Sequence, residues 1–134
     1  MIGRNLGRYR LVRELGSGGM GTVYEAVHKD LGRRVAIKVL HTDAAIGSDK
    51  LARFFNEART ASRIEHRSVV SVFEFDRTEE GAAYIIMEYL EGESLRNRLR
   101  KQPEVVAWKA LGYAQQMAAA LSVAHKKRVI HRDL

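Results

Sequence analysis

The chain has 134 residues, of which 46% are hydrophobic and 29% are charged, a composition typical of one globular domain rather than of a disordered or fibrous segment. It contains no cysteine, which excludes disulfides, thiolate zinc sites and thiol catalysis. The net charge of +7 is spread along the sequence without interleaved aromatic residues, so we expect no nucleic-acid partner.

The first part of the sequence predicts short antiparallel strands. β-Branched and aliphatic residues dominate residues 9–15, 23–28 and 35–40, and only short connections separate these runs. Two later runs of the same kind, residues 69–75 and 82–87, flank a turn at residues 78–81. We therefore expect a five-stranded antiparallel sheet.

One helix is predicted between the third and fourth of these strands. Ser48 is a suitable N-cap, and apolar residues recur after it at helical spacing. These residues are Leu51, Phe54, Phe55, Ala58, Ala61 and Ile64. Glu57 lies at the edge of this apolar face, so its carboxylate can point toward the sheet.

The last third of the sequence changes to a helical period. Ser94 predicts the N-cap of a short helix over residues 95–100, and Pro103 predicts the first turn of a long helix that ends near Lys126. The long helix has an apolar face made of Val106, Leu111, Ala114, Met117, Ala118 and Leu121.

Glycines at residues 16, 18 and 21 form a G-x-G-x-x-G frame, in which backbone N–H groups can approach phosphate oxygens because no side chain intervenes. A dinucleotide-binding fold requires a helix after such a loop, and a P-loop requires Gly-Lys-Ser/Thr at its end. The predicted strands on both sides of the loop fit neither motif. We interpret the loop as a hairpin over a ligand.

The residues that follow make this interpretation specific. Val23 lies two positions after Gly21, and the next strand contains Val-Ala-Ile-Lys at residues 35–38. Strand alternation places Ala36 and Lys38 on one face. Glu57 follows Lys38 by 19 residues on the predicted helix and can pair with this lysine. The sequence ends with His-Arg-Asp-Leu at residues 131–134, which contains Asp133.

Together these motifs resemble the catalytic domain of bacterial Hanks-type (eukaryotic-like) serine/threonine protein kinases, over residues 6–134. The resemblance implies an α+β fold. Residues 1–90 would form the N-lobe, with a five-stranded antiparallel sheet and one helix, and residues 91–134 would begin an incomplete helical C-lobe. The sequence departs from the pattern of this family at two positions. Arg128 stands where the family often has glycine, and Arg67 stands where it often has proline.

The resemblance assigns roles to individual residues. Gly16, Gly18 and Gly21 would cover the phosphates of ATP, Lys38 would hold the α- and β-phosphates, and Glu57 would orient Lys38. Asp133 would be the catalytic base toward the substrate hydroxyl. The adenine pocket would be lined by Leu15, Val23, Ala36 and Met87, and the backbone of Glu88 and Leu90 in the hinge would bind adenine.

The implied reaction is transfer of the γ-phosphoryl group of Mg-ATP to a serine or threonine of a protein substrate. The Asp-Phe-Gly segment that would hold Mg²⁺ is not in these residues, so we expect negligible activity from this chain alone. In this family the long helix packs inside a helical bundle that is not in these 134 residues, so we expect its apolar face to be exposed and the chain to self-associate. No apolar run is long enough to span a membrane and no signal peptide is recognisable, which predicts a cytoplasmic chain. The alternative of a membrane anchor in a segment beyond residue 134 stays open.

Two alternatives remain open from the sequence. The chain could be an ATP-binding or scaffolding module, similar to a pseudokinase, that binds a nucleotide or a partner kinase without transferring phosphate. Intact Lys38, Glu57 and Asp133 argue against this alternative. A basic nucleic-acid-binding domain would show salt-sensitive DNA binding that ignores ATP, and no motif requires it.

Overall fold

The computed structural model describes residues 1–41, 48–78 and 81–131. This part of the chain divides into two compact units. The first contains Met1–Arg63 and Val70–Tyr89, and the second contains Ile64–Val69 and the chain from Leu90 onward. The second unit therefore includes a short segment that precedes the fourth predicted strand.

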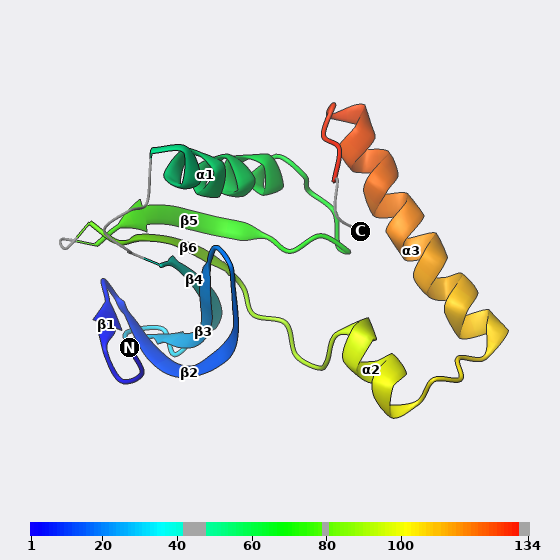
Figure 1. Cartoon of the computed structure of the whole chain (residues 1–134), viewed down its shortest axis with the longest axis horizontal. Coiled ribbons are helices and arrows are strands. Elements are labelled where there is room, and N and C mark those ends of the chain that lie inside the picture. Colours follow the sequence, from blue (N-terminus) through cyan, green and yellow to red (C-terminus); the bar gives the residue numbers. More distant parts are fainter. Residues whose placement is uncertain (42–47, 79–80, 132–134) are drawn as a thin grey trace. The chain divides into compact units, whose positions relative to one another are not determined.

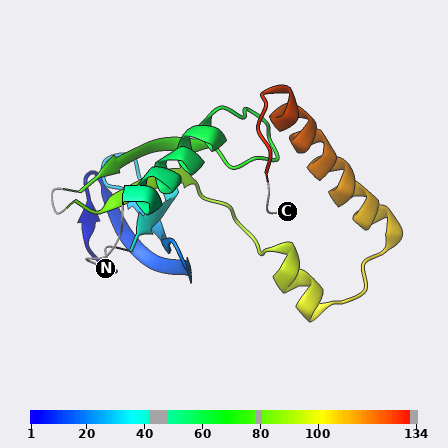
Figure 2. The same ribbon diagram turned by 45° about the horizontal axis from the view of Figure 1, so that its top comes forward.

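The first unit is built on a six-stranded antiparallel sheet with strand order β1-β2-β3-β4-β6-β5 (Figures 1 and 2). The strands are β1 (Asn5–Leu6), β2 (Tyr9–Gly18), β3 (Gly21–His28), β4 (Arg34–Leu40), β5 (Val72–Arg77) and β6 (Ala83–Glu88). The predicted α+β class is confirmed. The sheet has one strand more than predicted, because β1 is too short to show any periodicity in sequence.

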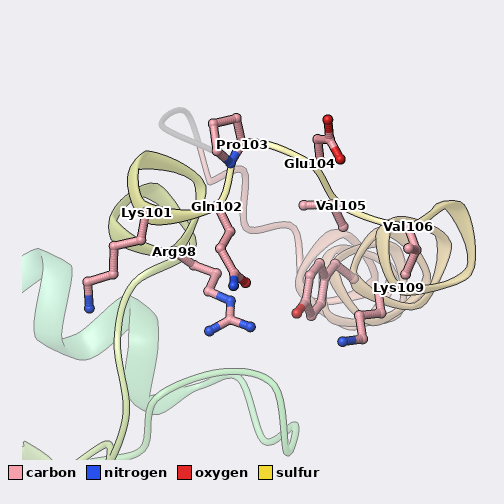
Figure 3. Close-up of a pocket in the computed structure, with 9 residues that line it drawn as sticks. Arg98, Lys101, Gln102, Pro103, Glu104, Val105, Val106 and Lys109 are labelled. Atoms are coloured by element: carbon pink, nitrogen blue, oxygen red, sulfur yellow. The ribbon is translucent and has the colours of Figure 1, made fainter.

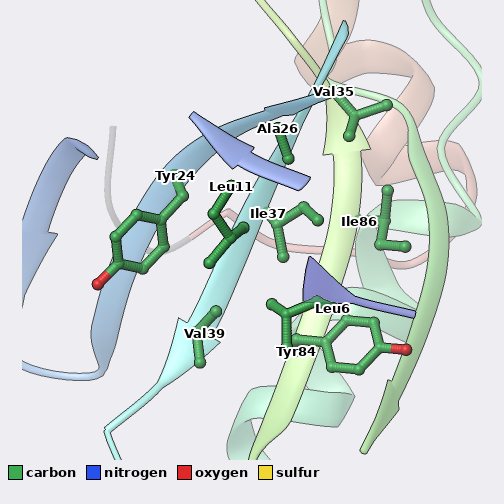
Figure 4. Packing of buried hydrophobic residues seen from close by; sticks show 9 residues of the cluster. All are labelled: Leu6, Leu11, Tyr24, Ala26, Val35, Ile37, Val39, Tyr84 and Ile86. Atoms are coloured by element: carbon green, nitrogen blue, oxygen red, sulfur yellow. The ribbon is translucent and has the colours of Figure 1, made fainter. Parts of the chain in front are cut away.

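Apolar side chains pack on both faces of this sheet. On one face, Leu6 and Leu11 pack against side chains of β3, β4 and β6 (Figure 4). On the other face, Phe54 and Ala58 of α1 (Ser48–Ser62) pack against Leu40, Ala83 and Ile85. Phe54 is fully buried, which fits its predicted place on the apolar face of this helix. The side-chain cap predicted at Ser48 lies outside the described residues.

The connection between α1 and β5 is longer than predicted at both of its ends. The strand expected from residue 69 begins at Val72, because the backbone N–H of Val69 donates to the carbonyl of His66 at 2.9 Å and holds this segment in a turn. The helix expected to continue to Ile64 ends at Ser62, whose hydroxyl donates to the carbonyl of Arg59. Side-chain bonds of this kind compete with helical backbone bonds.

The second unit contains α2 (Leu95–Lys101) and α3 (Ala107–Lys126). Ser94 caps α2 as predicted, because its hydroxyl accepts a hydrogen bond from the backbone N–H of Asn97 at 3.2 Å. α3 begins four residues after Pro103 rather than at it. Proline keeps Gln102 extended, and the two β-branched residues before Ala107 have low helix propensity.

The apolar face of α3 is open, as expected. Leu121 is half-buried and the other five predicted side chains are exposed, with 70% of Leu111 and 41% of Met117 accessible. In this helix only Ala124 is buried. None of the described helices combines the length and the apolar character that crossing a bilayer requires.

The C-terminus of α3 shows what one departure from the family pattern, Arg128, costs in conformational energy. Backbone bonds from Arg128 to His125 and from Val129 to Ala124, both 2.9 Å, form a Schellman motif. This motif places Arg128 at a φ of +58°, where glycine is normally favoured. A side chain in this conformation costs about 1 kcal/mol.

Candidate active site

The glycine-rich segment forms the predicted hairpin. Gly18 and Gly21 are cross-strand partners, so Gly19 and Met20 form a two-residue turn between β2 and β3. A Cβ atom on Gly21 would clash with the backbone carbonyl of Val39. Packing against β4 is therefore sufficient to explain why residue 21 is glycine.

Packing within the protein does not explain why residues 16 and 18 are glycine. Gly16 and Gly18 have no atom within 4 Å of the position that a Cβ would take, and neither has a positive φ. Side chains at these positions would fit into the first unit itself without strain. The lack of side chains there lets a molecule outside the protein approach the backbone of the hairpin closely.

Lys38 and Glu57 form the predicted ion pair. Nζ of Lys38, on β4, donates to Oε1 of Glu57, on α1, at 2.8 Å. The lysine side chain is 19% exposed, whereas that of Glu57 is 53% exposed, so the ammonium group is the better shielded partner. Nζ also lies 5.7 Å from the centre of the Phe54 ring. Phe54 belongs to α1, so its burial against the sheet fixes the helix that supplies the carboxylate.

The register of the strands places further predicted residues on the face that carries Lys38. Val23 pairs with Lys38 and with Gly16, and Ala36 pairs with Met87. Because cross-strand partners share a face, these residues lie on one surface of the sheet. Ala36 is buried and Met87 is half-buried. The surface around Lys38, beneath the hairpin, is therefore mainly apolar.

Four predicted residues remain, which are Leu15, Glu88, Leu90 and Asp133. Leu15 is 40% exposed and lies in an irregular step of β2, between Glu14 and Gly16. Glu88 ends β6 and is exposed. Leu90 belongs to the second unit and is 60% exposed. Asp133 lies outside the described residues.

A charged cluster at one end of this surface was not predicted. Glu25 is only 7% exposed, and its carboxylate contacts Nε of Arg13 at 2.6 Å and Nε of Arg34 at 3.5 Å. Arg13 also donates to the hydroxyl of Tyr89 at 2.9 Å, and the guanidinium of Arg34 lies 4.2 Å from the centre of the Tyr89 ring. Tyr89, which follows β6, is thus held by two arginines that share one buried carboxylate.

Comparison with known proteins decides the family. The protein kinase domain family matches residues 9–134. The chain belongs to the protein kinase family. Its kinase sequence is 45% identical over 128 residues to the serine/threonine-protein kinase pkn2 of Myxococcus xanthus, and 36% identical over 135 residues to PrkC of Bacillus subtilis. These matches cover 96% and 100% of the chain, and they confirm the predicted resemblance to bacterial serine/threonine kinases.

A solved structure supports the kinase fold independently. The kinase domain of Mycobacterium tuberculosis PknI matches all of this chain with a TM-score of 0.80 and 29% sequence identity. The chain covers 55% of that domain, and it spans only 15% of pkn2 and 21% of PrkC. It therefore corresponds to part of a kinase domain in proteins that are considerably longer.

The second unit of this kinase chain contains a cavity of about 600 Å³ between α2 and α3 (Figure 3). Its lining includes Arg98, Lys101, Lys109 and Tyr113, and none of the predicted site residues. Lys101 donates to Glu93 at 2.7 Å, and this hydrogen bond lowers the pKa of the Glu93 carboxyl. We assign no catalytic role to this cavity, because the Lys38–Glu57 pair and the glycine-rich hairpin belong to the other unit.

Proposed function

We propose that this chain supplies the ATP-binding part of a serine/threonine protein kinase that phosphorylates protein substrates. The Lys38–Glu57 ion pair carries this proposal, because it lies on the sheet face that continues into an open glycine hairpin. A lysine held by a helix carboxylate presents a fixed cation to phosphate oxygens. The apolar residues of the same face, Val23, Ala36 and Met87, would contact adenine.

The proposed roles follow from the chemistry of each group. Backbone N–H groups around Gly16 and Gly18 would donate to phosphate oxygens, while Lys38 would neutralise charge on the α- and β-phosphates. Glu57 would keep the ammonium group in place. Asp133 would accept the proton of the serine or threonine hydroxyl as the γ-phosphoryl group is transferred to it.

ATP is used by kinases as its Mg²⁺ complex, in which the metal neutralises phosphate charge. Among the described residues there is no group of three histidine, aspartate or glutamate side chains that could hold a metal ion. We therefore assign no magnesium ligand to these residues and propose that the ligands belong to an Asp-Phe-Gly segment outside the 134 residues. We also propose a cytoplasmic location.

The 134-residue chain should bind ATP but transfer phosphate negligibly, because the Asp-Phe-Gly segment is not in it. Isothermal titration calorimetry with ATP and incubation with radiolabelled ATP would measure the two properties on one preparation. ATP-dependent autophosphorylation by the pure chain that disappears in Lys38→Ala would contradict the predicted inactivity. An absence of ATP binding by a folded chain would contradict the proposed function itself.

We further propose that the isolated chain self-associates through α3. Trp108 and Leu111 are 71% and 70% exposed, and residues three positions apart lie on the same side of a helix. Sedimentation velocity should show an average mass that rises with protein concentration, and the variant Trp108→Glu/Leu111→Glu should remain monomeric. Equal behaviour of both proteins would contradict this proposal.

A further inference from the structure

Three polar side chains link the glycine-rich hairpin to the end of β4. Ser17 and Thr22 are cross-strand partners within the hairpin, and their hydroxyl oxygens lie 3.0 Å apart. Oγ1 of Thr22 lies 2.8 Å from Nε2 of His41, the residue that directly follows β4. The three residues thus form a continuous hydrogen-bonded chain between the hairpin and the strand that carries Lys38.

This polar chain lies on the opposite side of the sheet from the Lys38–Glu57 pair. Thr22 pairs with Val39, whereas its neighbour Val23 pairs with Lys38. Because neighbouring residues of a strand point to opposite faces, Thr22 points away from the face that carries Lys38. His41 and Thr22 would therefore act on a ligand through the hairpin and not by touching it.

On its β3 side the hairpin is held by the pairing of Gly21 and Thr22 with Leu40 and Val39 of β4, but its β2 side and its turn have few contacts. Around the Cβ positions of Gly16, Gly18 and Gly19 there is open space, so packing contributes little there. The backbone N–H of His41 reaches the carbonyl of Met20 only at 3.4 Å. A hydroxyl can donate one hydrogen bond and accept another, so Thr22 can bond Ser17 and His41 at the same time.

We propose that His41 is a positioning residue that fixes the glycine-rich hairpin, through Thr22 and Ser17, where its backbone reaches the phosphates of a bound nucleotide. Thr22 is only 7% exposed, so loss of His41 would leave a shielded hydroxyl with one partner fewer. The identity of the ligand rests on the proposed function. The inference that His41 holds the hairpin in place does not depend on the proposed function.

Nucleotide binding tests the consequence for the ligand. For His41→Ala and for Thr22→Val, which keeps the shape of the side chain, we expect the Kd for ATP to rise by roughly 3- to 10-fold, the effect of one hydrogen bond. Adenosine has no phosphate, so its Kd should stay within about twofold. His41→Gln, which can both donate and accept, should restore ATP binding, and His125→Ala on α3 serves as the control.

Hydrogen exchange tests the support of the hairpin without any ligand. In His41→Ala and Thr22→Val, the backbone amides of residues 18–21 should exchange faster than in the wild type, while those of α1 should not change. Wild-type exchange rates in both variants would overturn the proposal, whether or not the chain binds ATP. Equal losses of ATP and adenosine affinity would also overturn it, because they indicate a general structural defect. If the wild type binds no ATP, the proposed function is wrong, and the exchange rates still decide whether His41 holds the hairpin.

Discussion

Lys38→Met should weaken binding of ATP by roughly 10- to 100-fold and leave binding of adenosine nearly unchanged. A hydrogen bond to a charged group contributes about 1.5–3 kcal/mol, and about 1.4 kcal/mol corresponds to a tenfold change in Kd. Methionine keeps a side chain of similar length and removes the ammonium group, whose Nζ lies 5.7 Å from the centre of the Phe54 ring. Calorimetric titration of both ligands into the wild type and the variant would measure the difference.

Loss of stability is not expected to explain this result. Glu57 is 53% exposed, so its ion pair with Lys38 is partly solvated and should contribute less than about 1 kcal/mol to the free energy of unfolding. Lys29→Met provides a matched control, because Lys29 is an exposed lysine outside the site, and its Nζ donates to the carbonyl of Gly7 at 3.2 Å. An equal loss of ATP affinity in this control, or a parallel loss of adenosine affinity, would contradict the role of Lys38.

Much of the candidate site was predictable because it depends on local patterns. The alternation of β4 predicts that Lys38 and Ala36 share a face, and the period of α1 predicts that Glu57 borders its buried side. The two patterns place the cation and the carboxylate on neighbouring elements. The observed distance of 2.8 Å between their charged atoms agrees with this expectation.

Other features depend on tertiary information that the sequence pattern does not contain. The cluster of Glu25 with Arg13 and Arg34 depends on strand register, and β2 contains an irregular step just before Arg13. A shift of one residue would move every side chain to the opposite face. The hydrogen-bonded chain from Ser17 to His41 was missed for the same reason. The late start of α3, by contrast, follows from residues 103–106 and was locally detectable.

The cluster around Glu25 leads to the largest effect that we expect on stability. In Arg13→Ala/Arg34→Ala, the carboxylate of Glu25 would stay buried with neither of its two cations. An uncompensated buried charge is costly, and we expect the free energy of unfolding to fall by about 3 kcal/mol. This estimate lies at the low end for buried pairs because both arginine side chains are partly solvated, at 57% and 44% exposure. Urea denaturation followed by circular dichroism would measure it.

A third substitution separates the cost of the buried charge from the loss of the arginine side chains. Adding Glu25→Met to Arg13→Ala/Arg34→Ala replaces the carboxylate with an apolar side chain of similar size. This triple variant should therefore regain most of the lost stability. Arg96→Ala/Arg100→Ala on α2 removes the same number of arginines elsewhere and should change the unfolding free energy little. If Glu25→Met restored nothing, packing of the arginine side chains on Tyr89 would be the main contribution, and the buried carboxylate would have only a minor effect.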